Sequence, residues 1–534
     1  MTTTRHDVIV IGAGFAGLYA VHRAQTAGLS VLGIEAANGV GGTWYWNRYP
    51  GARCDVESVD YSYSFDDELQ QTWTWTERFA AQPEILAYLE HVADRFDLRQ
   101  RYAFGTSVVS AAFDQRSGTW EVHTSAGAHH RASFLLCATG CLSALNRPNI
   151  PGLDSFRGDV YYTADWPARE PDFAGKRVGL VGTGSSGIQA VPIIAGSAAT
   201  LTVFQRSPNY TVPMPNRPWS DDELGRIRVE YPERRRLSAY APAGTPHTSQ
   251  TKPVAETSPR EREQALQDRW SEGGVLFSKT FPDQLTNLAA NDVARQYAEA
   301  RIREIVADPS LADDLIPDDH PIGTKRICTD TGYYDTFNRE HVTLVNLRRE
   351  PITAIDAHAV HTTTTSYPCD ALIFATGFDA MTGALSRIDP VGPGDTQLTD
   401  IWADGPITFL GLAIPGLPNL FTFSGPGSPS VLANMVLHAE VQVDWVVDLI
   451  TAARSQGVTQ IDVRADAAAA WTRHVTAVSE GTLFVHATSS WYLGANIEGK
   501  KRVFMPYVGG FGAYRRECDD VAENEYAGMV FTSR

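Results

Sequence analysis

Two copies of the pattern Gly-x-Gly-x-x-Gly, each directly after a short apolar run, constrain this chain more than any other feature. The first copy spans residues 12–17 after the run 8–11, and the second spans residues 182–187 after the run 177–181. Apolar, β-branched runs bounded by glycine are typical of buried parallel strands. A strand, a glycine turn and a helix together form the unit that binds a dinucleotide pyrophosphate at a helix N-terminus. The sequence therefore predicts an α/β protein with two Rossmann-like dinucleotide-binding domains.

The first glycine pattern is followed by a carboxylate at the distance expected for a dinucleotide site. Glu35 stands 18 residues after the last glycine, at the end of a second predicted strand over residues 30–34. A carboxylate in this place accepts a hydrogen bond from a ribose hydroxyl group of the ligand. The residues of the pattern that we expect to contact this dinucleotide are Gly12, Gly14, Ala16 and Gly17.

The second glycine pattern is followed instead by a cation. Arg206 stands 19 residues after the last glycine, beyond a predicted strand over residues 201–204. A guanidinium group binds a 2′-phosphate, whereas a carboxylate would repel it. The two sites therefore predict two different dinucleotides, FAD in the first and NADPH in the second. The residues expected to contact NADPH here are Gly182, Thr183, Gly184, Ser185, Ser186, Gly187, Gln189, Arg206 and Ser207.

Composition removes several classes of protein that use two dinucleotides or bind charged polymers. Six cysteines are spread along 534 residues without a Cys-x-x-Cys pair, so we expect neither a disulfide reductase nor a metal site. Acidic residues outnumber basic ones by 62 to 45, which gives a formal charge of −17. Such a surface repels nucleic acid and anionic lipid, so the expected partner is a small molecule.

The ends of the chain and its apolar runs bear on location. No apolar stretch approaches the length that spans a membrane, and the first glycine pattern begins too early to leave room for a signal peptide. We therefore expect a cytoplasmic protein. We expect it to be a monomer or a weak oligomer.

Changes in composition and in the apolar pattern along the chain predict three structural units. Residues 209–320 are rich in charged residues and helix formers, which indicates a mostly helical insertion. Alternating apolar runs and helical patterns occupy the rest. We expect residues 1–142 and 380–534 to form the FAD-binding domain, and residues 143–208 and 321–379 to form the NADPH-binding domain.

Three shorter segments have a recognisable local pattern. Residues 241–258 are rich in Pro, Ser and Thr and predict a mobile loop near the start of the insertion. Residues 432–453 have the spacing of an amphipathic helix. Residues 491–514 are rich in glycine and aromatic residues and predict a C-terminal active-site loop.

A longer signature follows Glu35, with the sequence GGTWYWNRYPGARCD over residues 41–55. It resembles the signature of the type I Baeyer–Villiger monooxygenases, [A/G]-G-x-W, four residues, [F/Y]-P-[G/M], three residues, Asp, at every specified position. Residues 156–167 resemble the second signature of that family, F-x-G-x-x-x-H-T-x-x-W-[P/D], except that Tyr162 stands at the histidine. Tyrosine cannot become cationic near neutral pH, so this departure bears on how cofactor binding is coupled to domain movement.

The resemblance runs nearly end to end and includes residues 323–326, 375–379, 425–430 and 490–496. Within the family the chain looks most like the steroid and phenylacetone monooxygenases. The resemblance implies an FAD-dependent, NADPH-consuming enzyme that inserts one atom of O2 beside a ketone carbonyl through a C4a-peroxyflavin, giving an ester or a lactone. It implies aromatic, cyclic or steroidal C20 ketones as substrates, with some sulfoxidation. A flavin N- or S-monooxygenase, or an NADPH oxidase or redox-sensing flavoprotein, stays open as an alternative.

The resemblance also assigns roles to individual residues. Arg326 matches the catalytic arginine of the family, and Asp55 matches the acid placed behind it. Lys325 matches the residue that reaches the NADPH 2′-phosphate alongside Arg206, and Trp491 matches a tryptophan that contacts NADP+. Further residues of the long signature, or close to it in the fold, are expected to contact the cofactors: Thr43, Trp44, Tyr45, Trp46, Arg53, Asp55, Tyr61 and Val108. Arg326 is expected to contact a cofactor as well. The residues expected to line the substrate pocket are Ser430, Val431, Leu432 and Met435.

Overall fold

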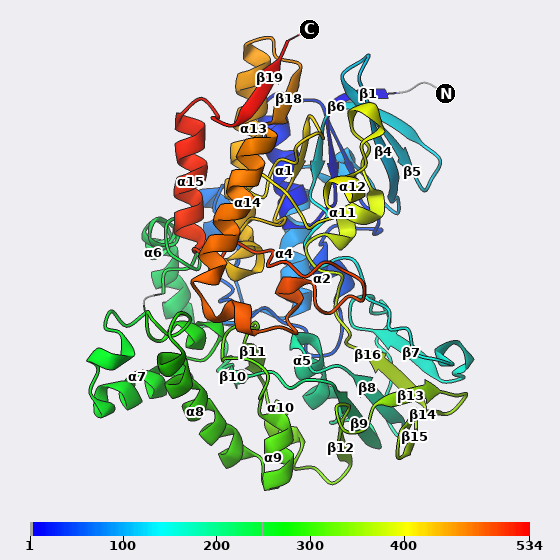
Figure 1. Cartoon of the computed structure of the whole chain (residues 1–534), viewed down its shortest axis with the longest axis vertical. Coiled ribbons are helices and arrows are strands. Elements are labelled where there is room, and N and C mark those ends of the chain that lie inside the picture. The colour runs from blue at the N-terminus through cyan, green and yellow to red at the C-terminus, as the bar shows by residue number, and fades with distance from the viewer. Residues whose placement is uncertain (1–3, 248, 534) are drawn as a thin grey trace.

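The computed structural model describes residues 4–247 and 249–533 and has two mainly parallel sheets in different halves of the molecule (Figure 1). The first sheet has the strand order β3-β2-β1-β6-β5-β4, and β17 pairs with β6. Its strands are β1 (Thr4–Ile11), β2 (Val31–Ile34), β3 (Tyr102–Ala103), β4 (Val108–Asp114), β5 (Thr119–Thr124), β6 (His129–Cys137) and β17 (Leu420–Thr422). Because β17 comes from the C-terminal third of the chain, this sheet combines both ends of the sequence.

The second sheet is parallel throughout and has the strand order β12-β9-β8-β16-β7. Its strands are β7 (Asp159–Tyr162), β8 (Arg177–Val181), β9 (Thr200–Gln205), β12 (Val342–Asn346) and β16 (Ala371–Phe374). A small sheet of β13 (Ile352–Ile355), β14 (Ala359–Thr362) and β15 (Ser366–Pro368) lies next to it in Figure 1. The prediction of an α/β protein with two Rossmann-like sheets is confirmed.

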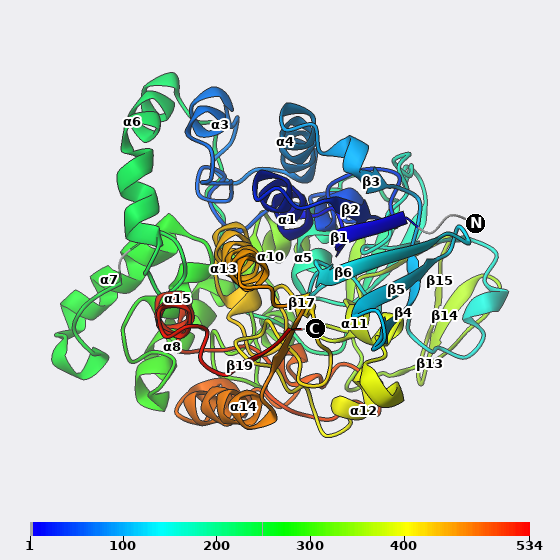
Figure 2. The same ribbon diagram turned by 90° about the horizontal axis from the view of Figure 1, so that it is seen from above.

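Each glycine pattern leads from a central strand into a helix. Helix α1 (Phe15–Thr26) follows β1, and helix α5 (Ser185–Ile194) follows β8. Val8, Ile9 and Val10 in β1 are fully buried, as expected for a strand covered on both faces. The long helix α13 (Met435–Ser455) packs beside α1, and Figure 2 shows the two helices side by side.

The segment between β9 and β12 is mostly helical and lies at the lower left of Figure 1. Its elements are β10 (Thr211–Pro213), α6 (Asp221–Ser238), α7 (Pro259–Glu272), α8 (Leu288–Ile305), α9 (Pro309–Leu315), β11 (Cys328–Asp330) and α10 (Tyr333–Thr336). Ser220 and Ser258 begin α6 and α7 with capping boxes, each closed by a glutamate three residues later. Strand β10 pairs with β11, so both ends of the segment meet. The domain boundaries themselves stay a prediction.

The C-terminal part differs from its predicted outline. Helix α13 begins at Met435 instead of residue 432, because the Asn434 side chain caps it and residues 430–432 form a separate 3-10 turn. The predicted loop 491–514 ends early, since α15 (Phe511–Glu523) begins after Gly510, whose φ of +92° turns the chain. The sequence interpretation also missed helix α14 (Ala465–Glu480) and the pairing of β18 (Gln460–Val463) with β19 (Met529–Thr532).

The remaining helices are short or peripheral to the two glycine turns. They are α2 (Thr43–Trp46), α3 (Asp67–Thr72), α4 (Gln82–Arg95), α11 (Gly383–Ile388) and α12 (Leu398–Ile401). Within residues 4–247 and 249–533, we find no helix whose length and apolar composition would allow it to cross a membrane.

Candidate active site

The two glycine patterns form turns that end at helix N-termini. Gly12 has φ +108°, and a Cβ there would lie 2.4 Å from the carbonyl oxygen of Ala138, so only glycine fits. Gly14 and Gly184 are the N-caps of α1 and α5, and no side chain in the described part of the chain caps either helix. A Cβ on Gly184 would meet no atom within 4 Å. Both helices therefore present open N–H groups to an anion, which fits a dinucleotide pyrophosphate.

Glu35 lies beside the first glycine turn. Its Oε2 accepts a hydrogen bond from the N–H of Ala13 at 2.6 Å, and its Oε1 accepts one from the N–H of Ala37 at 2.7 Å. Burial raises the pKa of this carboxyl group, although these N–H donors oppose the rise. The N–H of Thr106 donates to the backbone carbonyl of Glu35, which brings the start of β4 and Val108 toward the same end of the sheet. This is the place that a ribose-binding acid requires.

The long signature connects the two glycine turns. Its residues Thr43–Trp46 form helix α2, and Trp44 Nε1 donates to the hydroxyl of Tyr61 at 3.3 Å. Gln189 of α5 donates from Nε2 to the backbone carbonyl of Arg53 at 3.1 Å. The Arg53 guanidinium itself pairs with Glu77 at 2.6 Å. The signature therefore contacts helix α5 through Arg53 and lies beside the first glycine turn, where a Cβ on Gly42 would lie 2.8 Å from the Cα of Gly14. The contacts of these residues with a cofactor stay predictions.

Arg326 and Asp55 form a two-point ion pair although they are 271 residues apart in the sequence. Arg326 Nε donates to Asp55 Oδ2 at 2.8 Å, and Nη2 donates to Oδ1 at 2.7 Å. The two side chains are only 25% and 20% exposed. Burial opposes the charge of Arg326, but the Asp55 carboxylate outweighs it and raises the pKa of the guanidinium above its usual value. The pair is therefore a fixed cation held by a fixed carboxylate.

Three segments hold Arg326 in place. It stands two residues before β11, and Asn209 Nδ2 donates to its backbone carbonyl at 2.9 Å. Its Nη1 donates to the backbone carbonyl of Val431, in the loop before α13. The guanidinium thus joins the signature loop at Asp55 to the loop that the sequence predicts to bind substrate.

A cavity of about 320 Å³ opens in front of this pair. Asp55, Arg326, Val431 and Leu432 line it, which brings both predicted catalytic residues and two predicted substrate residues together. The other wall comes from the helical segment. The other polar side chains that line the cavity include Glu57, Arg78, His247, Arg269 and Glu272. The cavity therefore has both polar walls and an apolar wall at Val431 and Leu432.

A second cavity of about 100 Å³ lies on the other side of Leu432. Arg326 and Leu432 line both cavities, so the same arginine borders both spaces. Most of its wall is apolar and includes Leu285 and Phe484. Lys279 also lines it, at the end of a 3-10 turn over Val275–Lys279.

The other two predicted substrate residues lie behind the cavity walls. Ser430 is fully buried, and its hydroxyl donates to the carbonyl of Ser424 at 3.0 Å. Its φ of +47° is unusual for a residue with a side chain and marks a tight bend in the loop. Met435, the first residue of α13, packs against the same apolar cluster as Trp491. Neither is among the described residues that line the two cavities, so their contact with substrate stays a prediction.

A group of cations surrounds Asp319 near the end of β9. Lys325 Nζ lies 3.2 Å from Asp319 Oδ2, and Arg348 Nη2 lies 2.9 Å from the same oxygen. Arg348 also donates to the Ser207 hydroxyl at 3.2 Å. Burial lowers the pKa of Lys325, and the charges of Arg348 and Arg206 lower it further, although Asp319 opposes them. Arg206 is exposed and close enough for its charge to act on Lys325, so these two predicted phosphate-binding residues lie in one region.

Neither Trp491 nor Tyr162 is among the described residues that line the two cavities. Trp491 lies in the 3-10 turn Trp491–Leu493, with its ring 4.3 Å from that of Tyr492. Ser489 in the same loop donates to Asp319 at 3.0 Å, which ties this loop to the cation group. Tyr162 ends β7 and stacks on Phe374 with ring centroids 5.4 Å apart. A histidine in its place would add a charge that tyrosine cannot carry.

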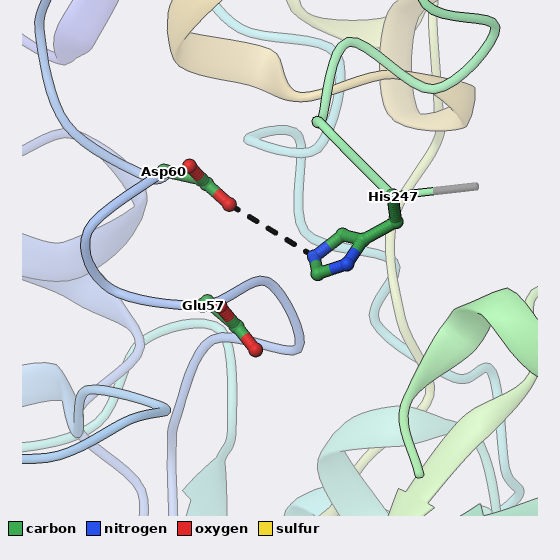
Figure 3. Close-up of side chains that lie close together, drawn as sticks. All are labelled: Glu57, Asp60 and His247. Carbon is green, nitrogen blue, oxygen red and sulfur yellow. Dashed lines mark ion pairs between the residues drawn. The ribbon is translucent and has the colours of Figure 1, made fainter. Parts of the chain in front are cut away.

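Glu57, Asp60 and His247 are close enough together to suggest a metal site (Figure 3). Figure 3 marks the contact from His247 to Asp60, which is 3.9 Å long. Both carboxylates, however, already pair with guanidinium groups. Arg234 lies 2.8 Å from Asp60, and Arg78 lies 2.7 Å from Glu57. These arginines supply the positive charge that a metal ion would bring, so we assign no metal to this cluster.

The sequence interpretation missed several residues that the fold brings to the site. Lys279 and Tyr492 line the second cavity with Arg326, and Arg348 joins the cations near Ser207. None of the three stands in a motif at a fixed distance from a glycine pattern. Lys279 also lies outside the segments to which the family resemblance assigns roles.

Comparisons with known proteins agree with this arrangement. A family profile described as "Pyridine nucleotide-disulphide oxidoreductase" matches residues 9–249, although the six cysteines of this chain are all free and buried. The "Baeyer-Villiger monooxygenase" of Pseudooceanicola batsensis is 38% identical over 528 residues, which cover 98% of this chain and 96% of the relative.

Two solved structures match the whole fold. The structure titled "Oxidized steroid monooxygenase bound to NADP" is 52% identical with a TM-score of 0.95, covering 99% of this chain and 100% of that one. The "OTEMO complex with FAD and NADP" is 38% identical with a TM-score of 0.96, also covering 99% and 100%. With end-to-end identity of this size, two dinucleotide turns and the Arg326–Asp55 pair, the chain belongs to the Baeyer–Villiger monooxygenase family.

Proposed function

We propose that this chain uses FAD, NADPH and O2 to insert one oxygen atom beside a ketone carbonyl, through a C4a-peroxyflavin, giving an ester or a lactone. The proposed substrates are aromatic, cyclic or steroidal C20 ketones, with sulfoxidation of thioethers as a side activity. The observation that supports this most directly is the Arg326–Asp55 pair in the wall of the 320 Å³ cavity. A fixed guanidinium there can stabilise an oxyanion that develops on the ketone oxygen.

The chain's own residues have separate tasks in this proposal. Arg326 supplies the charge, and Asp55 positions it through two hydrogen bonds. Val431 and Leu432 provide the apolar wall that keeps water from the reacting carbonyl. Because Arg326 also binds the Val431 carbonyl, a movement of the substrate loop would move the guanidinium with it.

FAD and NADPH are the cofactors that we propose for the two helix N-termini. The open N–H groups of α1 and the nearby Glu35 carboxylate suit the pyrophosphate and ribose of FAD. The open N-terminus of α5 and the cations Arg206 and Lys325 suit NADPH with its 2′-phosphate. When bound, the flavin would supply the activated oxygen and NADPH the reducing electrons.

Product analysis tests the reaction type. The purified holoenzyme is given NADPH and a panel of aromatic, cyclic and C20 steroid ketones. For each mole of NADPH consumed, we expect one mole of ester or lactone. The same panel should include a thioether and a tertiary amine. Oxidation of the thioether and the amine without any ester would favour the N- or S-monooxygenase alternative. NADPH consumption that yields only hydrogen peroxide would favour the oxidase.

Replacing Arg206 by alanine is expected to raise the KM for NADPH at least tenfold and to leave the KM for NADH nearly the same. The reason is that a charge-assisted contact to the 2′-phosphate, worth ~1.5–3 kcal/mol, exists only with NADPH. Steady-state rates with each cofactor measure the effect. Arg349→Ala is the matched control, because Arg349 is an exposed arginine that pairs with Asp314. An equal rise for both cofactors would remove Arg206 from this role.

We also propose a cytoplasmic location and a monomeric or weakly oligomeric state. Six free, buried cysteines suit a reducing compartment. Size-exclusion chromatography with light scattering tests the oligomeric state directly.

A further inference from the structure

The second cavity contains a positive charge that the chain does not neutralise. Its charged lining residues are Lys279 and Arg326, and no described residue of its lining is acidic. Asp55 already neutralises Arg326 through the two-point ion pair. The uncompensated charge of this small, mostly apolar space therefore belongs to Lys279.

The position of Lys279 is fixed by its neighbours. It ends the 3-10 turn Val275–Lys279, in which Phe277 is fully buried. The next residue, Thr280, is also buried and donates to the Phe277 carbonyl at 2.9 Å. The backbone on both sides is therefore anchored in the interior, and the partly exposed lysine side chain lines the cavity.

The ammonium group of Lys279 has no counter-ion in the described chain. No residue within 4–247 and 249–533 gives it a hydrogen bond or an ion pair. Burial and, to a smaller extent, the nearby charge of Arg326 lower its pKa to about 8. Charged groups in an apolar space are costly unless an opposite charge accompanies them.

A second polar group in the same wall is also unsatisfied. The Tyr492 hydroxyl is buried and has no hydrogen-bond partner among the described residues. Tyr492 follows Trp491 and packs against Phe484, which also lines the cavity. A cation and a hydroxyl group, both lacking partners, are the donor set that binds a carboxylate.

We propose that Lys279 is a specificity-determining residue that binds a carboxylate carried by the ketone substrate, so that the enzyme prefers keto acids to neutral ketones of the same skeleton. The inference rests on the proposed function, because Arg326 lines both cavities and would face the ketone carbonyl while Lys279 holds the far end. A carboxylate fits better than a phosphate, since its single charge matches the single free cation.

Matched substrates measure this preference in the holoenzyme. 4-Oxocyclohexanecarboxylate and its methyl ester have the same ring and differ in one charge, and 4-acetylbenzoate and its methyl ester form a second pair with a longer, aromatic span. We expect kcat/KM to be higher for the acid in at least one pair. Lys279→Met, which keeps the length of the side chain and removes its charge, should lower the acid-to-ester ratio in that pair at least tenfold.

Two further variants control for indirect effects. Lys279→Arg retains the charge and should keep a preference for the acid. Lys252→Met makes the same substitution at an exposed lysine that pairs with Glu261, and it should leave the ratio at the wild-type value. Thermal unfolding should show no loss of stability in Lys279→Met, because the substitution removes a charge that has no partner in a mostly apolar cavity.

The outcomes separate this inference from the proposed function. The inference is wrong if the enzyme oxidises ketones without preferring the acid in either pair. It is also wrong if Lys279→Met keeps the preference for the acid. A rise in the KM for NADPH with an unchanged ratio would place Lys279 at the cofactor and also overturn the inference. If no ketone is oxidised, the proposed function fails, and equilibrium dialysis of 4-oxocyclohexanecarboxylate with the oxidised holoenzyme still tests Lys279. There the Kd should rise at least tenfold in Lys279→Met, and an equal Kd would refute the inference.

Discussion

Replacing Arg326 by alanine is expected to lower ester formation at least ~10³-fold while FAD binding and flavin reduction by NADPH persist. Removing one well-placed donor to a developing oxyanion costs ~10²–10³ in rate. The variant also removes the positive charge that Asp55 holds in the wall of both cavities. The two cofactor turns do not depend on this side chain, because its hydrogen bonds go to Asp55 and Val431. Stopped-flow absorbance of the flavin and chromatography of the product measure the two halves of the reaction separately.

A matched control exists on the surface. Arg177 forms the same two-point pair with Asp370, but both side chains are more than 40% exposed. Arg177→Ala should therefore change the rate of ester formation less than twofold, since exposed pairs contribute little. If Arg326→Ala kept the wild-type yield of ester, the proposed catalytic role of Arg326 would be wrong.

Replacing Asp55 by alanine is expected to lower kcat ~100-fold with a much smaller change in the KM for the ketone. The side chain does not supply the charge, but without it the guanidinium loses both hydrogen bonds that orient it. We also expect a loss of ~1–3 kcal/mol in the free energy of unfolding, because Arg326 would stay largely buried without its partner. Steady-state kinetics and thermal unfolding measure the two effects.

The conservative variant distinguishes positioning from a general loss of structure. Asp55→Asn keeps the shape and one acceptor oxygen, so it should recover part of the rate that Asp55→Ala loses. Asp370→Ala removes the carboxylate of the exposed pair and should leave kcat unchanged. A kcat that is equal in Asp55→Ala and in the unaltered enzyme would show that Arg326 needs no carboxylate to hold it.

The parts of this fold that sequence could predict are those fixed by local chemistry. Gly12 and Gly182 must be glycine because of their backbone angles, and the distances from each pattern to Glu35 and Arg206 follow from one strand–helix–strand unit. The central strands were recognisable because each contains a run that is buried and apolar throughout, such as residues 8–11 in β1 and 372–374 in β16. The ion pair between Asp55 and Arg326 lies across 271 residues and could be expected only from the family resemblance.

Other features depend on contacts that no local pattern contains. In the sequence, Lys279 is one of many charged residues in a segment predicted to be helical. Only the fold shows that it lines the same cavity as Arg326. Arg348 likewise becomes a neighbour of Ser207 only because β12 pairs with β9. The start of α15 was hidden by the glycines around Phe511, since glycine in a first helical turn resembles a loop.

The pairing of β17 with β6 also sets the order of events during synthesis. Residues 135–137 of β6 leave the ribosome about 280 residues before their partner in β17, which at typical rates of translation is a delay of roughly 15–60 s. During that time an apolar strand edge that includes Leu135 and Leu136 has no neighbour to cover it. The nascent chain therefore stays soluble only if this edge aggregates slowly or is covered by chaperones until the last third of the chain has been made. Fragments that end before residue 420 should accumulate in inclusion bodies.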